Sequence, residues 1–242
     1  MICQENILKS NMLHQLATDN IHFPPLSEAL SDPPGLLAVG GDLSVPRLLN
    51  AYQSGIFPWF GEGDPILWWA PTPRMVLQPE KVKISKSMAK LIRQKRYQIT
   101  FDQAFDRVVK QCADTPRSAQ LDEQATWIVP AMQIAYKRLF EAGYAHSIEV
   151  WDQGNLVGGL YGVAIGKIFC GESMFSHRSN TSKLAFIALA QWLQKWQFNL
   201  IDCQLPTDHL ASLGAEAISK TAFENCLSNN ALYGLDSYWN KK

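Results

Sequence analysis

The sequence predicts an α+β protein with two domains: a small, loop-rich N-terminal domain and a larger domain built on a mostly antiparallel central sheet. Prolines crowd residues 20–80, where they break up any long helix or strand. From residue 85 onward three helical patterns follow one another, and then come several strand patterns separated by turns, a further helix and a last strand. This order is typical of the α+β class. We place the boundary near residue 75, so the predicted domains are residues 1–75 and 76–242.

The N-terminal domain is predicted to contain one short helix, at residues 44–54. Pro46 stands in its first turn and Gly55 directly after its end, which are favoured positions for these two residue types. A dense group of aromatic side chains follows within thirteen residues: Phe57, Trp59, Phe60, Trp68 and Trp69. Prolines and aromatic residues at this density indicate a compact, loop-rich unit.

Three helices with one apolar face open the second domain. Ser85 can cap the first, which reaches about Arg96, and Asp102 can cap the second. The third covers residues 129–142 and stops at Gly143. The side chains expected to face the core are Met88, Leu91 and Ile92, then Phe105, Val108, Val109 and Cys112, and then Met132, Ala135, Tyr136 and Leu139.

Strand patterns follow these helices. The predicted strands are residues 147–151, 156–165 and 167–175 and, after a helix from Asn180 or Thr181 to Trp196, residues 198–204. The first two strands are joined by a turn at residues 152–155, which predicts an antiparallel hairpin.

Composition excludes several classes of protein. The chain has 242 residues, of which 47% are apolar, and no segment reaches the roughly 18 apolar residues of a membrane span. Residues 1–20 are polar throughout, unlike a secretory signal. The five cysteines are widely spaced and form no CxxC pair, which favours reduced thiols in the cytoplasm over disulfides or a zinc site. We therefore expect a cytoplasmic protein without a metal ion.

Charge is balanced, with 22 basic and 22 acidic residues, so any contact with nucleic acid must be local. Residues 81–96 provide the candidate segment, because they hold seven basic residues and no acidic one. The candidate phosphate contacts are Lys83, Lys86, Lys90 and Arg93. A solvated helix face explains the same pattern, and the charge run by itself favours that interpretation.

Two segments carry polar residues in apolar surroundings. Residues 158–175 are rich in glycine and include Glu172, whose carboxylate would be costly to bury without a partner. In residues 200–204, strict alternation places Asp202 and Gln204 on one strand face and Cys203 on the other. Each segment has an ordinary alternative: a strand end that brings Glu172 to solvent, and an Asp202 that caps the following loop.

Several familiar sites are absent from the sequence. It contains no GxSxG, GxxxxGK[ST] or HExxH motif, and its histidines lack metal-ligand spacing. Cys170 and Cys203 would be nucleophiles only beside a histidine, and buried inert thiols are the better interpretation of both.

Taken together, eleven short segments resemble the leucyl/phenylalanyl-tRNA–protein transferase family. They are GLLAVGGDLS at 35–44, AY at 51–52, GIFPWF at 55–60, ILWW at 66–69, PTPR at 71–74, TWI at 126–128, HSIEVW at 146–151, LVGG at 156–159, FCGESMF at 169–175, LIDCQ at 200–204 and SLGA at 212–215. Each fragment is weak alone, but the ordered set covers most of the chain and is highly specific.

The resemblance implies a fold and an activity. The second domain is expected to have the fold of GCN5-related acetyltransferases. The activity is transfer of Leu or Phe, and to a lesser extent Met, from aminoacyl-tRNA to the N-terminal Arg or Lys of acceptor proteins, which marks them for degradation in the N-degron pathway. We expect a monomer, and we expect no cofactor because the ester of an aminoacyl-tRNA is already activated.

Residue roles also follow from the resemblance. The pocket for the aminoacyl side chain and the 3′-terminal adenosine is expected at Trp59, Trp127, Leu160, Phe169 and Met174. The catalytic residues are expected to be Asp202, Gln204 and Glu172. We assign the proton of the attacking amine to Asp202, acting with Gln204, and attraction of the cationic acceptor to Glu172.

Some features depart from the family pattern. Leu160 stands where a methionine is expected, and residues 115–124 and 176–180 also differ. Strict alternation would put Phe169 and Glu172 on opposite faces of one strand, so a bulge at Gly171 is expected if both reach the site.

Two competing functions are considered. An acyl-CoA-dependent acyltransferase would need a glycine-containing pyrophosphate loop, and residues 178–182 contain no glycine. A non-catalytic RNA-binding module would leave Asp202, Gln204 and Glu172 unexplained.

Overall fold

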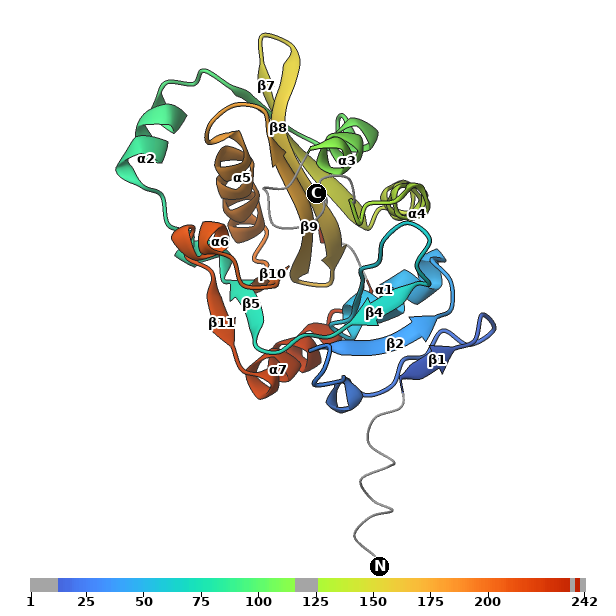
Figure 1. Cartoon of the computed structure of the whole chain (residues 1–242). Helices are drawn as coiled ribbons and strands as arrows, with labels where there is room; N and C mark the ends of the chain where they lie inside the picture. Colours follow the sequence, from blue (N-terminus) through green and yellow to red (C-terminus); the bar gives the residue numbers. More distant parts are fainter. Residues whose placement is uncertain (1–12, 116–125, 236–237, 240–242) are drawn as a thin grey trace, which may run out of the picture.

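The computed structural model describes residues 13–115, 126–235 and 238–239. Cys3, the polar N-terminal stretch up to residue 12 and most of the 115–124 segment lie outside these residues. The described chain forms two sheets (Figure 1). The first has four strands in the order β1-β2-β4-β3. Their bounds are β1 His14–Leu16, β2 Leu36–Gly40, β3 Phe57–Pro58 and β4 Leu67–Trp69.

The second sheet has seven strands in the order β11-β5-β10-β9-β8-β7-β6. Their bounds are β5 Arg74–Leu77, β6 Gln98–Phe101, β7 Ala145–Asp152, β8 Asn155–Ile165, β9 Ile168–Ser176, β10 Leu200–Gln204 and β11 Glu216–Ile218. Neighbouring strands are antiparallel except β9 and β10, which are parallel. The predicted α+β class with a mostly antiparallel sheet is therefore confirmed.

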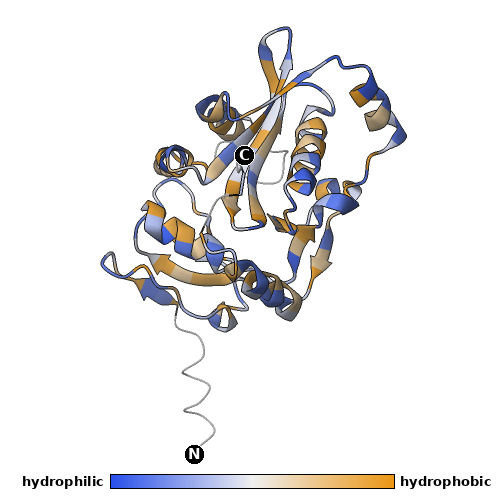
Figure 2. Ribbon diagram, turned by 180° about the vertical axis from the view of Figure 1, so that it is seen from behind, coloured by the Kyte–Doolittle hydropathy of each residue, from blue (hydrophilic) through white to orange (hydrophobic). Residues whose placement is uncertain are grey.

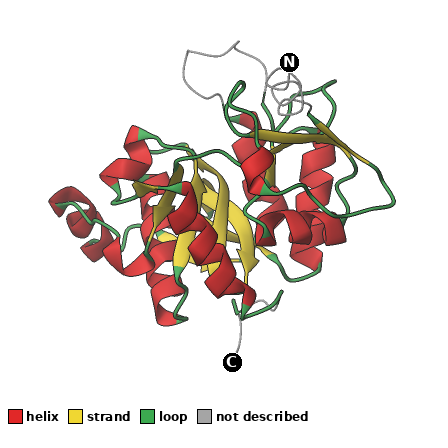
Figure 3. Ribbon diagram, turned by 90° about the horizontal axis from the view of Figure 1, so that it is seen from below, coloured by secondary structure: helices red, strands yellow, loops and turns green. Residues whose placement is uncertain are grey.

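Helices cover both faces of this sheet. Their bounds are α1 Val45–Gln53, α2 Lys86–Arg93, α3 Phe105–Asp114, α4 Pro130–Glu141, α5 Thr181–Lys195, α6 Asp208–Ser212 and α7 Lys220–Ala231. Single 3₁₀ turns lie at Leu26–Glu28 and Pro79–Lys81. Figure 1 shows α5 on one face of the sheet and α3 and α4 on the other, and Figure 3 gives the view from below. None of the described helices is long and apolar enough to cross a membrane.

The predicted helices of the second domain are confirmed with small shifts at their ends. The Ser85 hydroxyl accepts from the Met88 N–H, as a cap should, and α2 ends at Arg93 rather than Arg96. In α3 and α4 the predicted core-facing residues are all buried. Figure 2 shows hydrophilic and apolar residues alternating around the helices, as expected for helices with one buried side.

Asp102 does not cap α3, which corrects the prediction. Its carboxylate accepts from the Ser147 N–H (2.8 Å), and its other oxygen lies 2.8 Å from Nδ1 of His146. The residue at the start of α3 is Ala104, which has no capping side chain. Asp102 therefore fixes the β6–α3 connection to β7.

The predicted domain boundary is close to a change of sheet. The chain leaves the first sheet after Trp69 and enters the second at Arg74. Buried residues of both sheets nevertheless belong to one apolar cluster, in which Leu37 and Trp68 join Tyr161 and Val163. The division into residues 1–75 and 76–242 therefore stays a prediction.

The parallel pair β9 and β10 creates the opening that holds the site. The two strands pair only from Ile168 to Cys170 on β9 and from Leu200 to Asp202 on β10. Beyond these positions β9 continues to Ser176, paired with β8, while β10 ends at Gln204. The sheet therefore splits at this point.

Candidate active site

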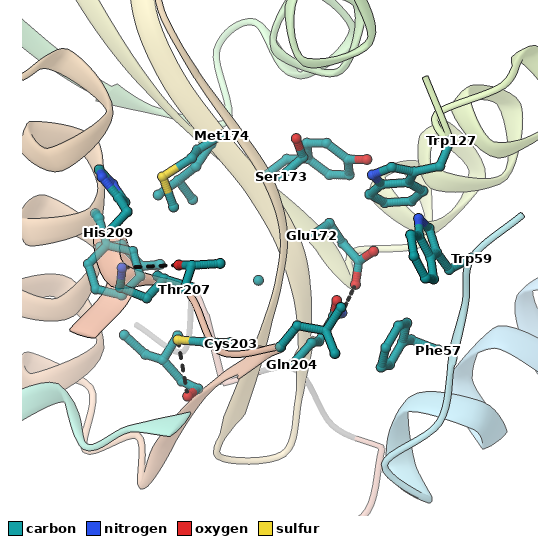
Figure 4. A pocket seen from close by; sticks show the side chains of 18 of the residues that line it. Phe57, Trp59, Trp127, Glu172, Ser173, Met174, Cys203, Gln204, Thr207 and His209 are labelled. Carbon is teal, nitrogen blue, oxygen red and sulfur yellow. Dashed lines mark hydrogen bonds between the residues drawn. The ribbon is translucent and has the colours of Figure 1, made fainter. Parts of the chain in front are cut away.

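A cavity of about 380 Å³ lies at the split between β9 and β10 (Figure 4). Its walls come from both sheets, from α5 and α6, and from the segment before α4. The lining residues are Phe57, Pro58, Trp59, Trp127, Leu160, Tyr161, Gly171, Glu172, Ser173, Met174, Phe186, Leu189, Ile201, Cys203, Gln204, Leu205, Thr207, His209 and Leu210. Segments far apart in the sequence thus meet at one cavity.

The cavity has two chemically different sides. Glu172 and Gln204 lie on one side together with three aromatic rings, those of Phe57, Trp59 and Trp127 (Figure 4). Met174, Cys203, Thr207 and His209 lie on the other side (Figure 4). The lining also includes the apolar side chains of Leu160, Phe186, Leu189 and Ile201. One molecule can therefore place an apolar group and a polar group in the same cavity.

Glu172 is the extra residue of a β-bulge. Tyr161 of β8 pairs with Ser173, and the next residue, Gly162, pairs with Gly171, so Glu172 has no partner opposite it. The expected bulge is therefore present, one residue later than Gly171. It aims the carboxylate toward α4 and away from the regular ladder.

Neutral donors hold the Glu172 carboxylate. It accepts from the Tyr136 hydroxyl and, at 3.0 Å, from the side-chain amide of Gln204. The Tyr136 hydroxyl also lies 2.8 Å from that of Tyr52 in α1. Burial raises the pKa of Glu172 to about 7, although the hydrogen bonds from Tyr136, Tyr52 and Gln204 oppose the shift. Near neutral pH this carboxyl group can therefore either take or give a proton.

Asp202 has different surroundings. Its two oxygens accept from Nε and Nη2 of Arg74 at 2.8 and 2.7 Å, and both side chains are buried. The backbone N–H of Gln204 also donates to Asp202, at 3.0 Å. Asp202 does not line the cavity, whereas Cys203 and Gln204 both do, because β10 bulges at Cys203. The predicted strict alternation over residues 202–204 does not hold.

Phe169 is displaced from its predicted place. Its ring is fully buried in the apolar cluster on the α5 side of the sheet, 5.7 Å from the ring of Trp239, and it is not among the lining side chains. Glu172 bonds to Tyr136 of α4 on the other face of the sheet, so the bulge does not bring the two side chains to the same face. Of the predicted pocket residues, the four on the cavity wall are Trp59, Trp127, Leu160 and Met174.

The two candidate thiols are not activated. Burial and the nearby Asp202 carboxylate raise the pKa of both Cys170 and Cys203 well above the usual thiol range, so both are protonated at neutral pH. Cys112 and Cys226 form no disulfide within the described part of the chain, and Cys3 lies outside it. Among the described residues no group of His, Cys, Asp and Glu side chains has the arrangement of a metal site.

Comparison with known proteins identifies the family. A sequence model described as "Leucyl/phenylalanyl-tRNA protein transferase" matches residues 76–228, and one for the N-terminal domain of the same family matches residues 41–72. A Leucyl/phenylalanyl-tRNA–protein transferase of Pseudomonas fluorescens (strain Pf0-1) is 55% identical over 90% of this chain and 95% of its own length. One from Chromobacterium violaceum is 55% identical over 86% of this chain and 88% of its own length. The chain belongs to this transferase family.

Solved structures show only weak likeness to this family member. A GCN5-related N-acetyltransferase from Kribbella flavida is 10% identical, with a TM-score of 0.37 over 69% of this chain and 58% of its own. The L-PGS structure from Bacillus licheniformis is 12% identical, with a TM-score of 0.38 over 82% of this chain and 67% of its own. Likenesses this low carry no weight, and the fold rests on the strand order described above.

The basic segment of this family member adjoins one wall of the cavity at Lys83, and α2 projects away from the central sheet (Figure 1). The side chains of Lys83, Lys86, Lys90 and Arg93 are exposed, and no ion pair holds any of them within the described part of the chain. The Lys83 N–H donates to the Leu213 carbonyl at 2.8 Å, directly after α6, which supplies His209 and Leu210 to the cavity wall. The segment is thus joined to one wall of the cavity.

Sequence reasoning missed the partners that hold the carboxylates. Arg74 and Tyr52 stand in the family motifs without an assigned role, and Tyr136 was expected merely to face the core. One signal for Tyr136 was available, since a hydroxyl on a buried helix face needs a partner.

Proposed function

We propose that this protein transfers Leu or Phe, and to a lesser extent Met, from aminoacyl-tRNA to the N-terminal Arg or Lys of acceptor proteins. The observation that carries the proposal is the match to transferases of this name over 90% of the chain. The cavity agrees with it, because an apolar wall adjoins a polar side. We further propose that the protein acts as a cytoplasmic monomer and that the transfer marks acceptors for degradation in the N-degron pathway.

The apolar side of the cavity suits the donor side chain. Leu160, Met174, Phe186 and Leu189 offer aliphatic, thioether and aromatic surface without a charge. Such a wall accepts Leu, Phe and Met and disfavours smaller side chains by about 1–3 kcal/mol per missing methylene. Because Leu160 is less flexible than methionine, it makes this side more rigid.

The aromatic side suits the end of the tRNA. Trp59 lines the cavity and is about one-third exposed (37%), and Trp127 lies beside it (Figure 4). Adenine stacks on the face of an indole without hydrogen bonds to the base edge. This contact therefore tolerates any tRNA body. The exposed basic residues of α2 and Lys83 then contact the phosphates, which reconciles RNA binding with balanced net charge.

Chemically, the donor ester needs no further activation. The neutral acceptor nitrogen forms a bond to the ester carbonyl carbon, the carbon–oxygen bond to the ribose breaks, and the ribose oxygen gains the proton that the nitrogen gives up on becoming an amide. An α-amine with a pKa of roughly 7.7–8.0 is mostly protonated at neutral pH and must lose that proton before it attacks.

Glu172 is the best-placed group for this proton. It lines the cavity and has a pKa of about 7, close to that of the amine, whereas both oxygens of Asp202 are occupied by Arg74. We therefore propose that Glu172 receives the proton while its amide partner Gln204 fixes the carboxylate. This moves the proton role, first inferred for Asp202, to Glu172. The ionised carboxylate also attracts a cationic Arg or Lys.

The test mixes purified protein with leucyl-tRNA and a peptide that begins with Arg, and the peptide mass is then read. We expect a gain of one leucine residue with Arg or Lys at the N-terminus, and none when the same peptide is N-acetylated. No gain with Leu-, Phe- or Met-tRNA from folded protein would contradict the proposal. A parallel reaction with acetyl-CoA tests the acyltransferase alternative, and tRNA binding without any transfer would favour the RNA-binding module.

A further inference from the structure

We propose that Arg74 is a positioning residue for the transfer reaction: it fixes Asp202, and through Asp202 it aims the side-chain amide of Gln204 at Glu172. The inference rests on the proposed function, in which Glu172 takes the proton. Arg74 does not line the cavity, so it acts through other residues rather than on the substrate.

Arg74 is held rigidly from both sides. Its guanidinium lies between two aromatic rings, 4.9 Å from the centre of Phe57 and 4.7 Å from that of Phe223. Phe57 belongs to the first sheet and lines the cavity, whereas Phe223 belongs to α7. The residue is only 2% exposed. Such a stack, together with the two-pronged bond to Asp202, leaves the guanidinium one orientation.

Asp202 transmits this position to Gln204. The Asp202 oxygen that accepts from Nε of Arg74 also accepts from the backbone N–H of Gln204. Gln204 has a left-handed backbone (φ 64°), which is costly for a residue other than glycine, and the Leu205 N–H donates back to the Cys203 carbonyl at 2.8 Å. The Asp202 carboxylate therefore stabilises a tight turn whose backbone is strained at Gln204.

The turn determines where the Gln204 side chain points. Its amide donates to Glu172 at 3.0 Å, across the split between β10 and β9. A donor to the ionised carboxylate favours its charged form, so loss of this bond raises the pKa of Glu172 further. A change at Arg74 should therefore alter the titration of a carboxyl group that Arg74 does not touch.

The test compares Arg74→Met and Arg74→Lys with a matched control, Arg47→Met. Arg47 is also fully buried and bonded to a carboxylate, that of Asp42, but it lies in the N-terminal part and lines no part of the cavity. Two quantities are measured: kcat and KM for leucyl-tRNA with an Arg peptide, and the titration of the ¹³C-labelled Glu172 carboxyl in the free protein, assigned with Glu172→Gln.

For Arg74→Met we expect kcat to fall by about 100-fold with KM for leucyl-tRNA unchanged, because a misplaced group near the reacting atoms costs about that much. The Glu172 titration should move to higher pH. Arg74→Lys should recover part of kcat, since it restores the charge without the planar fork. Arg47→Met should move neither kcat nor the titration.

The proposal would be overturned if the Glu172 titration in Arg74→Met were the same as in the wild type. It would also be overturned if the fraction of unfolded protein accounted for the whole loss of kcat. If Arg74→Met does not fold, Arg74→Lys carries the test with the same two readouts: it keeps the charge beside Asp202 but lacks the planar fork, so its Glu172 titration should still move to higher pH than in the wild type. A wild-type protein without any transfer activity would contradict the proposed function instead. The titration would still test the effect of Arg74 on Glu172.

Discussion

At the scale of single residues, two neighbouring buried carboxylates have opposite surroundings. Asp202 faces a guanidinium, which satisfies its charge, whereas Glu172 is held by hydroxyl and amide groups that carry none. When two carboxyl groups in one site have such different surroundings, they usually have different roles in the reaction. The sequence predicted that both lie near the site. It did not predict their partners, because Arg74 is 128 residues away from Asp202 along the chain.

The raised pKa of Glu172 has a consequence for stability. Its pKa rises from 4.5 to about 7 on folding, so the folded protein holds this proton more tightly than the unfolded chain. The resulting stabilisation is complete below pH 4.5 and is lost as the pH rises through about 7. Urea unfolding of wild type and Glu172→Gln between pH 4 and 8 measures it. We expect wild type to lose stability relative to the variant over that window. If the free energies of unfolding of the two proteins changed in parallel with pH, the raised pKa of Glu172 would be contradicted.

At the scale of elements, neighbouring atoms lie so close to two positions of β8 that only glycine fits there. A Cβ on Gly162 would meet the Cys170 carbonyl at 2.2 Å and the Phe169 ring at 2.6 Å. A Cβ on Gly158 would meet the Thr181 hydroxyl at 2.4 Å. The sequence predicted close approach or bulges in this segment, but it did not show which glycine serves which purpose.

Gly162 and Gly171 form a matched pair, because they face each other across β8 and β9. A Cβ on Gly171 meets only the Asp202 carbonyl, at an ordinary 3.7 Å. Gly162→Ala should therefore destabilise the protein by about 1–3 kcal/mol. Gly171→Ala should stay within about 0.5 kcal/mol of wild type. Urea unfolding at fixed pH measures the free energy of unfolding of both variants. Equal losses in the two variants would contradict the prediction, because the clash at Gly162 would then cost nothing to relieve.

The basic surface is also an element-scale feature, carried by α2 and the residue Lys83 before it. Replacing Lys86 and Lys90 with Gln should weaken tRNA binding more at low salt than at high salt. The slope of log affinity against log salt should fall by about 0.7–0.9 for each phosphate that the variant no longer neutralises. Filter binding over a salt series measures this slope. An unchanged slope would mean that α2 presents an ordinary solvated face.

Short strands account for most of what the sequence did not predict among the elements. β5, β6 and β11 have only three or four residues each, too few for an alternating pattern to stand out. The helices α1 to α5 and the long strands β8 and β9 were predicted, because their periodicity extends over several repeats, whereas the twelve-residue helix α7 was not predicted. The parallel pairing of β9 with β10, which opens the cavity, depends on contacts across the whole fold.

At the scale of the whole molecule, the two sheets form one structural unit. Tyr52 of α1 bonds to Tyr136 of α4, and α1 also contacts β8. Arg74 is held between one ring that precedes it in the first sheet and another in α7. The site therefore needs residues from both sheets, and the division of the chain into residues 1–75 and 76–242 stays a prediction.

A shared core predicts unfolding in a single step. Amide hydrogen exchange in β2 and in β8 should report the same free energy of opening, and both should respond equally to urea. The measurement is native-state exchange over a urea series. If the amide hydrogens of β2 became exchangeable at lower urea concentrations than those of β8, the N-terminal part would unfold independently.

The central claim is that Glu172 takes the proton during transfer of the aminoacyl group, and the pH dependence of single-turnover leucine transfer tests it most directly. For wild type we expect the rate to rise with pH around a midpoint near 7, the pKa of Glu172. Glu172→Gln should lower the plateau by about 10²–10⁴-fold and move the midpoint to that of the acceptor amine, roughly 7.7–8.0. A Glu172→Gln variant with the wild-type plateau and midpoint would contradict the claim.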